Sequence, residues 1–272
     1  VAGLLKKNQS IITGRPFRSP HHTVSAIALA GGGTIPKPGE ISLSHNGVLF
    51  LDELPEFNRN ALEVMRQPLE DREVTIARIH GKYVYPAGFM LVAARNPCPC
   101  GMYPDLNKCT CSYRQIRQYN AKISRPLLDR IDINVNVQKV AYEDLLGTKK
   151  AETSAQIRKR VLAAQKIQRE RYRSESFHFN SQLDGRRTQK YIKLGSAEEA
   201  MIRDVFEETD LSARGYNRVL KIARTIADLD GSPEIREIHL KEALFFRYQN
   251  LLEDGETGRS RSYGKGAFGY GA

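Results

Sequence analysis

The stretch Val48-Leu49-Phe50-Leu51-Asp52-Glu53 decides the fold class, because four apolar residues lead directly into two adjacent carboxylates. A short apolar run of this kind is typical of a parallel strand covered on both faces. Sheets built from such strands bind ligands at the edge where the carboxyl ends of the strands lie. There Asp52 could hold Mg²⁺, usually through water, and Glu53 could orient an attacking water. Taken alone, the two carboxylates could equally do no more than end a strand.

The residues from Gly47 to Val137 extend this run into an α/β pattern. Phe89 to Ala94 is a second apolar run and predicts a second buried strand. Between the two runs, 58–71 places its apolar residues on one helical face behind a capping Asn58. The alternation of apolar and polar residues over 131–137 predicts a third, less buried strand.

After about residue 150 the apolar period is near 3.6, so the second half is predicted to be helical. Ser154 is the expected cap of a long basic helix that ends near Tyr172, and Ser196-x-x-Glu199 is a predicted capping box. A further helix carries an apolar stripe from Tyr216 to Ala227. We therefore expect a partial parallel-sheet core over 1–145, an all-α lid domain over 146–256 and a disordered tail over 257–272.

The overall composition indicates which class of partner the protein binds. The chain has 272 residues, with 42 basic against 31 acidic side chains and a net charge of +11, which favours a polyanionic partner. A solvated basic surface is the alternative. No apolar run approaches the roughly 20 residues that span a bilayer. No secretory signal pattern is present at the N-terminus. We expect a soluble, cytoplasmic protein without a membrane partner.

Two further polar residues follow elements of the predicted core. Asn96 comes directly after the second strand, where its side chain could reach a γ-phosphate or an attacking water; before Pro97 it could also be a turn residue. Arg130 follows a helical segment and could project into a neighbouring subunit's site to stabilise charge on a transferred phosphoryl group. The alternative is a solvated surface arginine between Asp129 and Asp132.

The chain resembles the magnesium-chelatase-like AAA+ ATPases, specifically the ComM (YifB) family, from Val1 to about Leu252. The resemblance rests on six ordered segments: RPFRSPHHT, PGEISLSHNGVLFLDELPEF, LEVMRQPLEDREVTIAR, NPCPCG, SRPLLDRIDINV and SARGYNRVLKIARTIADL. Family members resemble hexameric ATPase rings that use ATP and Mg²⁺, and the ComM branch is associated with DNA branch migration. The roles that this resemblance implies are Walker B at Asp52 and Glu53, sensor 1 at Asn96, an arginine finger at Arg130 (alternative Arg125) and nucleotide-binding sensor 2 at Arg214 (alternative Arg218).

One motif of such ATPases is missing from these 272 residues. No G-x-x-x-x-G-K-[ST] occurs, and Gly264-Lys265-Gly266 has neither the spacing nor the hydroxyl. The chain also begins at Val1 without an initiator methionine. We therefore expect a fragment that lacks the Walker A loop, with an intact protein that is an ATPase and a fragment that is inactive or nearly so.

A predicted β-hairpin from Glu73 to Pro86 has a basic tip. In the group that the chain resembles, such a hairpin faces the central pore of the ring, so Lys82 and Arg78 could grip DNA phosphates; an ordinary surface hairpin is the alternative. The Gly31 to Gly39 segment resembles a second insertion facing the pore. His21 and His22 chelate metal poorly as neighbours on a strand, which favours a structural or DNA-contacting role.

All four cysteines fall in one stretch as two C-x-C pairs, Cys98/Cys100 and Cys109/Cys111. Four thiolates suit structural Zn²⁺, although C-x-x-C is the commoner spacing. Free buried thiols are the alternative, and a disulfide is the weaker interpretation.

Taken together with the resemblance, these features favour an ATP-dependent motor on DNA. The alternatives are a magnesium chelatase ATPase subunit and a non-catalytic, zinc-stabilised nucleic-acid-binding module.

Overall fold

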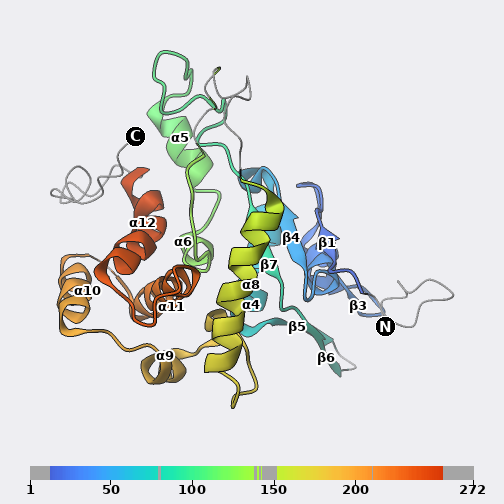
Figure 1. Cartoon of the computed structure of the whole chain (residues 1–272). Coiled ribbons are helices and arrows are strands. Elements are labelled where there is room, and N and C mark those ends of the chain that lie inside the picture. The colour runs from blue at the N-terminus through green and yellow to red at the C-terminus, as the bar shows by residue number, and fades with distance from the viewer. Residues whose placement is uncertain are drawn as a thin grey trace. The chain divides into compact units, whose positions relative to one another are not determined.

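The computed structural model describes residues 13–78, 81–137, 140, 142, 152–209 and 211–253. The chain divides into two compact units, residues 1–131 and 132–272. The first contains a parallel sheet with short helices, and the second is helical (Figure 1). The predicted α/β core followed by an all-α region is therefore confirmed. The domain boundary predicted at 145 and the tail predicted over 257–272 lie outside the described residues and stay predictions.

The first unit is built on a parallel sheet of three strands in the order β1-β4-β7. The strands are β1 (Phe17–Arg18), β4 (Val48–Leu51) and β7 (Met90–Ala93). Leu49 is paired with Leu91, and Leu51 with Ala93. Because β4 and β7 run in the same direction, their carboxyl ends lie at one edge of the sheet, which is the edge where ligands of open α/β sheets bind.

Within the described residues, the sheet is covered on one face only. Leu49 and Leu51 are fully buried, whereas Phe17 and Met90 on the opposite face are 65% and 63% exposed. The expectation of strands covered on both faces is therefore wrong for these residues. The reason is that the chain's own helices supply packing partners on the Leu49 side alone; these are α1 (Ala26–Ala30), α2 (Glu40–Leu43), α3 (Arg59–Glu63) and α6 (Arg125–Leu128).

Gly47 lies where the backbone before β1 touches the start of β4. A Cβ at this position would be 1.9 Å from the Pro16 carbonyl oxygen, which accepts a hydrogen bond from the Val48 N–H at 2.8 Å. Rotation of a side chain cannot relieve a clash with backbone. We expect Gly47→Ala to destabilise the first unit by about 2 kcal/mol, seen as faster hydrogen exchange in β4. The control is Gly14→Ala, because a Cβ there meets nothing within 4 Å; equal exchange in both variants would contradict the prediction.

The helix predicted over 58–71 forms as two pieces. Asn58 caps α3 as expected, and its Oδ1 accepts the Asn60 N–H at 2.9 Å. The chain then turns at Val64, and α4 runs from Arg66 to Asp71. Pro68 explains the break, because it has no N–H to donate to the Val64 carbonyl and its ring crowds that carbonyl.

The predicted hairpin is confirmed. Strands β5 (Glu73–Arg78) and β6 (Gly81–Pro86) are antiparallel, with Arg78 paired with Gly81. Ile79 and His80 at its tip lie outside the described residues. A smaller antiparallel pair, β2 (Gly31–Gly32) and β3 (Lys37–Pro38), forms in the glycine-rich segment. The remaining regular elements of this unit are the 3₁₀ helix η1 (Leu54–Glu56) and α5 (Tyr113–Asn120).

The strand predicted over 131–137 does not form. Ile133, Val135 and Val137 are 51%, 60% and 90% exposed. Alternation specifies which side chains would share a face, but a strand also needs a neighbouring backbone. Within this segment the Asn134 N–H donates to the Phe246 carbonyl of a helix at 3.2 Å. That contact cannot build a ladder.

The second unit packs around helix α11. Its elements are α8 (Ser154–Arg171), η2 (Asn180–Gln182), α9 (Gly185–Tyr191), α10 (Ser196–Glu208), α11 (Ala213–Leu229) and α12 (Glu237–Glu253). Helix α11 contacts α8, α9 and α12, and its Val219, Ala223 and Ala227 are fully buried. The predicted apolar stripe is thus the centre of this core. Among the described helices, none has the length and apolar content that crossing a bilayer requires.

The predicted helix starts are displaced by one residue. Thr153, not Ser154, caps α8 and forms a capping box with Gln156. Gly195 stands at the cap of α10, and no side chain makes a cap hydrogen bond there. Ser196 is already the first helical residue, so the predicted box with Glu199 is wrong. Local sequence places such starts only to within a residue or two.

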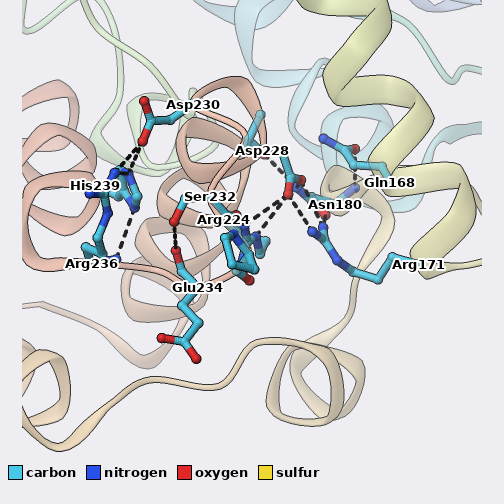
Figure 2. Close-up of polar contacts among 12 residues, drawn as sticks. Gln168, Arg171, Asn180, Arg224, Asp228, Asp230, Ser232, Glu234, Arg236 and His239 are labelled. Atoms are coloured by element: carbon cyan, nitrogen blue, oxygen red, sulfur yellow. Dashed lines mark hydrogen bonds and ion pairs between the residues drawn. The ribbon is translucent and has the colours of Figure 1, made fainter.

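A buried ionic cluster joins α8, η2 and α11 (Figure 2). The Asp228 carboxylate, whose side chain is 0% exposed, accepts hydrogen bonds from Arg171 at 2.5 and 2.9 Å, Asn180 at 2.9 Å and Arg224 at 3.1 Å. Arg224 also donates to the carbonyls of Ser232 and Pro233 at 2.6 and 2.9 Å. One carboxylate therefore ties the end of α11 to two elements that precede it by some fifty residues.

Candidate nucleotide site and cysteine cluster

Asp52 and Glu53 form an exposed turn at the carboxyl end of β4. Backbone hydrogen bonds join this turn to the end of β7: Ala94 N–H donates to Leu51 O and Leu54 N–H donates to Ala94 O, both at 2.9 Å. Glu53 has a left-handed backbone (φ 51°), unusual for a residue with a side chain. Its N–H donates to the Asp52 Oδ1 at 2.9 Å. The two carboxylates are thus held side by side and open to solvent.

His22 is a neighbour of this turn that sequence reasoning missed. Its Nδ1 lies 3.3 Å from the Glu53 Oε2, and its ring contacts His21 and the edge of Phe57, with centroids 4.0 and 6.4 Å away. No local pattern pointed to this contact, because the two residues come from separate segments. The imidazole offers a hydrogen-bonding partner that can orient the Glu53 carboxylate.

Asn96 is exposed three residues beyond β7, at the same edge of the sheet as Asp52. The loop around it is anchored to α5 on one side and passes close to Gly101 on the other. Arg95 donates to the Asn120 Oδ1 in α5 at 3.2 Å, and a Cβ on Gly101 would lie 3.9 Å from the Asn96 Cγ. The placement agrees with a side chain that reaches a ligand beside Asp52; its role as sensor 1 stays a prediction.

Arg130 is less exposed than its predicted role suggests. Its side chain is 11% exposed, and it donates to the Glu70 Oε2 at 2.5 Å and to the Pro126 carbonyl at 2.7 Å. It lines an open groove along β5 that Arg78 also lines. Arg125, the alternative finger, is exposed at the first position of α6. A reaching role for Arg130 therefore requires release from Glu70, whereas Arg125 is already at the surface.

Arg214 and Arg218 belong to the second unit, near the start of α11. Arg214 is exposed at the second helical position. The Arg218 side chain is 12% exposed, and its Nη1 lies 2.9 Å from the Asp132 Oδ1. Both sensor 2 assignments stay predictions.

The two segments predicted to face a pore lie against each other. Arg78 in β5 donates to the Gly33 carbonyl at 3.4 Å, and the Tyr85 hydroxyl in β6 donates to the Pro36 carbonyl at 2.9 Å. Lys82 is exposed at the start of β6. The hairpin and the glycine-rich segment thus form one projection, in which Arg78 braces the joint and Lys82 remains exposed.

The four cysteines converge. Their Sγ atoms all lie within 4.8 Å of one another, with 3.4 Å between Cys98 and Cys100, 3.8 Å between Cys98 and Cys109, and 3.6 Å between Cys100 and Cys109. All four are free thiols, and Cys98 is buried. Thiolates in this arrangement could hold a metal ion.

The surroundings of the cluster shift the pKa values of its thiols in opposite directions. Hydrogen bonds from the backbone N–H groups of Met102 and Thr110 and from the neighbouring thiols lower the pKa of Cys100 to about 6, against opposing desolvation. At Cys109 the backbone N–H of Cys111 acts to lower the pKa, but desolvation and the neighbouring sulfurs raise it to about 12. One thiolate is therefore favoured at neutral pH, and its negative charge resists a second ionisation.

Two family models match the chain. That of magnesium chelatase, subunit ChlI, matches residues 1–145, and that of the ChlI C-terminal region matches 151–247.

Individual relatives agree with these matches. Competence protein ComM of Haemophilus influenzae is 47% identical over 234 residues, which are 86% of this chain and 45% of that protein. Uncharacterized protein YifB of Escherichia coli is 44% identical over the same shares. An uncharacterized protein of Mycobacterium bovis is 40% identical over 91% of this chain and 49% of its own length. The chain thus spans about half the length of these curated relatives, and the two matched models show that it belongs to the magnesium chelatase ChlI family.

Proposed function

We propose that this chain is part of an ATP-dependent motor that acts on DNA, of the branch-migration type associated with the ComM branch. The observation that carries the proposal is the exposed Asp52–Glu53 turn, joined by backbone hydrogen bonds to the end of β7 at the carboxyl edge of the sheet. Asn96 follows β7 at that edge. This is the arrangement that hydrolysis of a bound nucleotide requires of its acidic and polar groups.

Each group has a part in this chemistry. Carboxylate oxygens suit Mg²⁺, and Asp52 offers an exposed pair of them. Glu53 orients water, with His22 steadying its carboxylate. Bound Mg·ATP would supply the phosphoryl group. Because the chain has no G-x-x-x-x-G-K-[ST], the proposal concerns a longer protein that adds this loop and assembles into a ring, a hexamer by family resemblance.

Contact with DNA is assigned to the β5–β6 hairpin. Lys82 is exposed there, and the net charge of +11 favours a phosphate backbone as partner. We expect Lys82→Ala in the full ring to weaken DNA binding and to reduce the slope of log affinity against log salt by about 1 per lost contact. Lys190→Ala serves as a control, because Lys190 is paired with Glu175 in the second unit. An unchanged salt slope in Lys82→Ala would remove the hairpin from the DNA interface.

Two assays test the function. Salt-dependent retention on DNA separates a DNA motor or binding module from a magnesium chelatase subunit, which the family match keeps in view. DNA-stimulated ATP hydrolysis by a protein that includes the phosphate-binding loop separates the motor from a non-catalytic, zinc-stabilised module. Retention together with stimulated hydrolysis supports the motor. Hydrolysis without retention on DNA would favour a magnesium chelatase ATPase subunit over a DNA motor.

A further inference from the structure

The sulfur geometry of the cysteine cluster matches one small ion. A zinc–sulfur bond of about 2.3 Å in a tetrahedron places the sulfurs about 3.8 Å apart. The Sγ atoms of Cys98, Cys100 and Cys109 are 3.4, 3.8 and 3.6 Å apart. These separations are far longer than a disulfide bond of about 2.05 Å. A cluster of several irons would hold cysteines bound to different irons farther apart, because bridging sulfides separate the irons that these cysteines ligate.

The loop between the two pairs is organised around the sulfurs. Gly101 takes a left-handed turn (φ 75°), and its N–H donates to the Cys98 carbonyl at 3.0 Å. The Tyr103 N–H points to the Cys98 Sγ at 3.5 Å. Farther along, the Cys109 N–H donates to the Asp105 carbonyl at 2.8 Å. The backbone thus returns the second pair of cysteines to the first and offers N–H donors to sulfur, as thiolate ligands require.

We propose that Cys98, Cys100, Cys109 and Cys111 bind one Zn²⁺ as four thiolates, and that this ion holds in place the loop that carries Asn96. Binding releases up to four thiol protons to solvent and leaves a site of net charge −2. Soft sulfur ligands in a tetrahedron select zinc over the magnesium that an acidic site prefers.

The expected effect of the ion on the Asn96 loop follows from where the cysteines lie in the chain. Cys98 is two residues after Asn96, and Ser112, directly after Cys111, caps α5 by a capping box with Gln115. The cluster therefore lies between the end of β7 and the start of α5. Without the ion, the contacts among the four thiols stabilise this loop only weakly. The zinc site itself is independent of the proposed ATPase activity.

Metal analysis of the full chain, purified under reducing conditions, tests the site. We expect about one zinc per chain and, after exchange with Co²⁺, the visible absorption of a tetrahedral thiolate complex. The Cys98→Ser/Cys109→Ser variant should lose both signals. Leu106→Ala changes a loop side chain that is 78% exposed and should keep them. Absence of zinc and of a cobalt spectrum in the unmodified chain, an iron–sulfur chromophore, or a native disulfide by mass spectrometry would overturn the proposal.

The bracing role has its own readout, which does not need the variants to fold. Removal of zinc from the unmodified chain by a chelator should accelerate hydrogen exchange in peptides covering 94–112, and adding Zn²⁺ back should restore protection. Peptides of β5 and β6 serve as the internal reference and should change little. Unchanged exchange over 94–112 would show that the ion does not hold the Asn96 loop.

Discussion

Asp228→Ala should destabilise the second unit by about 3–5 kcal/mol, because it leaves two largely buried guanidinium groups without their shared carboxylate. The Arg171 and Arg224 side chains are 19% and 6% exposed, so water cannot replace the lost partner fully. Burial acts to lower the pKa of Arg171, but the hydrogen bond to Asp228 raises it. Burial lowers the pKa of Arg224 despite the same carboxylate. Because the ordinary pKa of a guanidinium lies far above neutral, both arginines stay charged in the variant even without Asp228, and their unpaired charge is what destabilises the unit.

The chain has two compact units, so the loss of stability is best measured by hydrogen exchange, which reports on the second unit separately. Amides of α11 should lose protection by a factor that corresponds to the expected destabilisation. Asp204→Ala is the matched control, because Asp204 is exposed on α10 in the same unit and should change stability by less than about 0.5 kcal/mol. Similar effects of the two substitutions would mean that the Asp228 cluster is not what holds α8 and η2 to α11.

Glu53→Gln should lower the rate of ATP hydrolysis about 10²–10⁴-fold in a protein that supplies the phosphate-binding loop. The amide is nearly the same size but cannot accept a proton from water. The Glu53 side chain is 55% exposed at a turn that backbone hydrogen bonds hold, so we expect folding and nucleotide binding to be retained. Steady-state hydrolysis and equilibrium nucleotide binding, measured side by side, separate a loss of chemistry from a loss of affinity.

Glu56→Gln is the control for this prediction. Glu56 lies in η1 three residues further along, where its carboxylate is paired with Lys122 at 3.2 Å. Its substitution should leave hydrolysis within about twofold of the unmodified protein, because an exposed ion pair of this kind contributes little. If Glu53→Gln hydrolysed ATP as fast as Glu56→Gln, Glu53 would not be the group that activates water.

Sequence by itself determined the elements whose side-chain pattern is local. The run before Asp52 became β4, the hairpin formed at Glu73–Pro86, and the stripe of α11 became the core of a helical unit. The two cysteine pairs could be identified as possible metal ligands from type and spacing alone. These features are encoded within a few turns or strand residues, and neighbouring groups do not need to be known.

Tertiary structure decided everything that depends on a partner distant in the chain. The segment 131–137 alternates like a strand, yet it forms no ladder in the described structure, because its Asn134 N–H meets the Phe246 carbonyl of α12 and not a neighbouring strand. Arg130 could be read as a projecting finger until Glu70, sixty residues earlier, was seen to hold it. His22 gained its place beside Glu53 in the same way. Local sequence records the type of each side chain, whereas these contacts depend on which segments packing brings together.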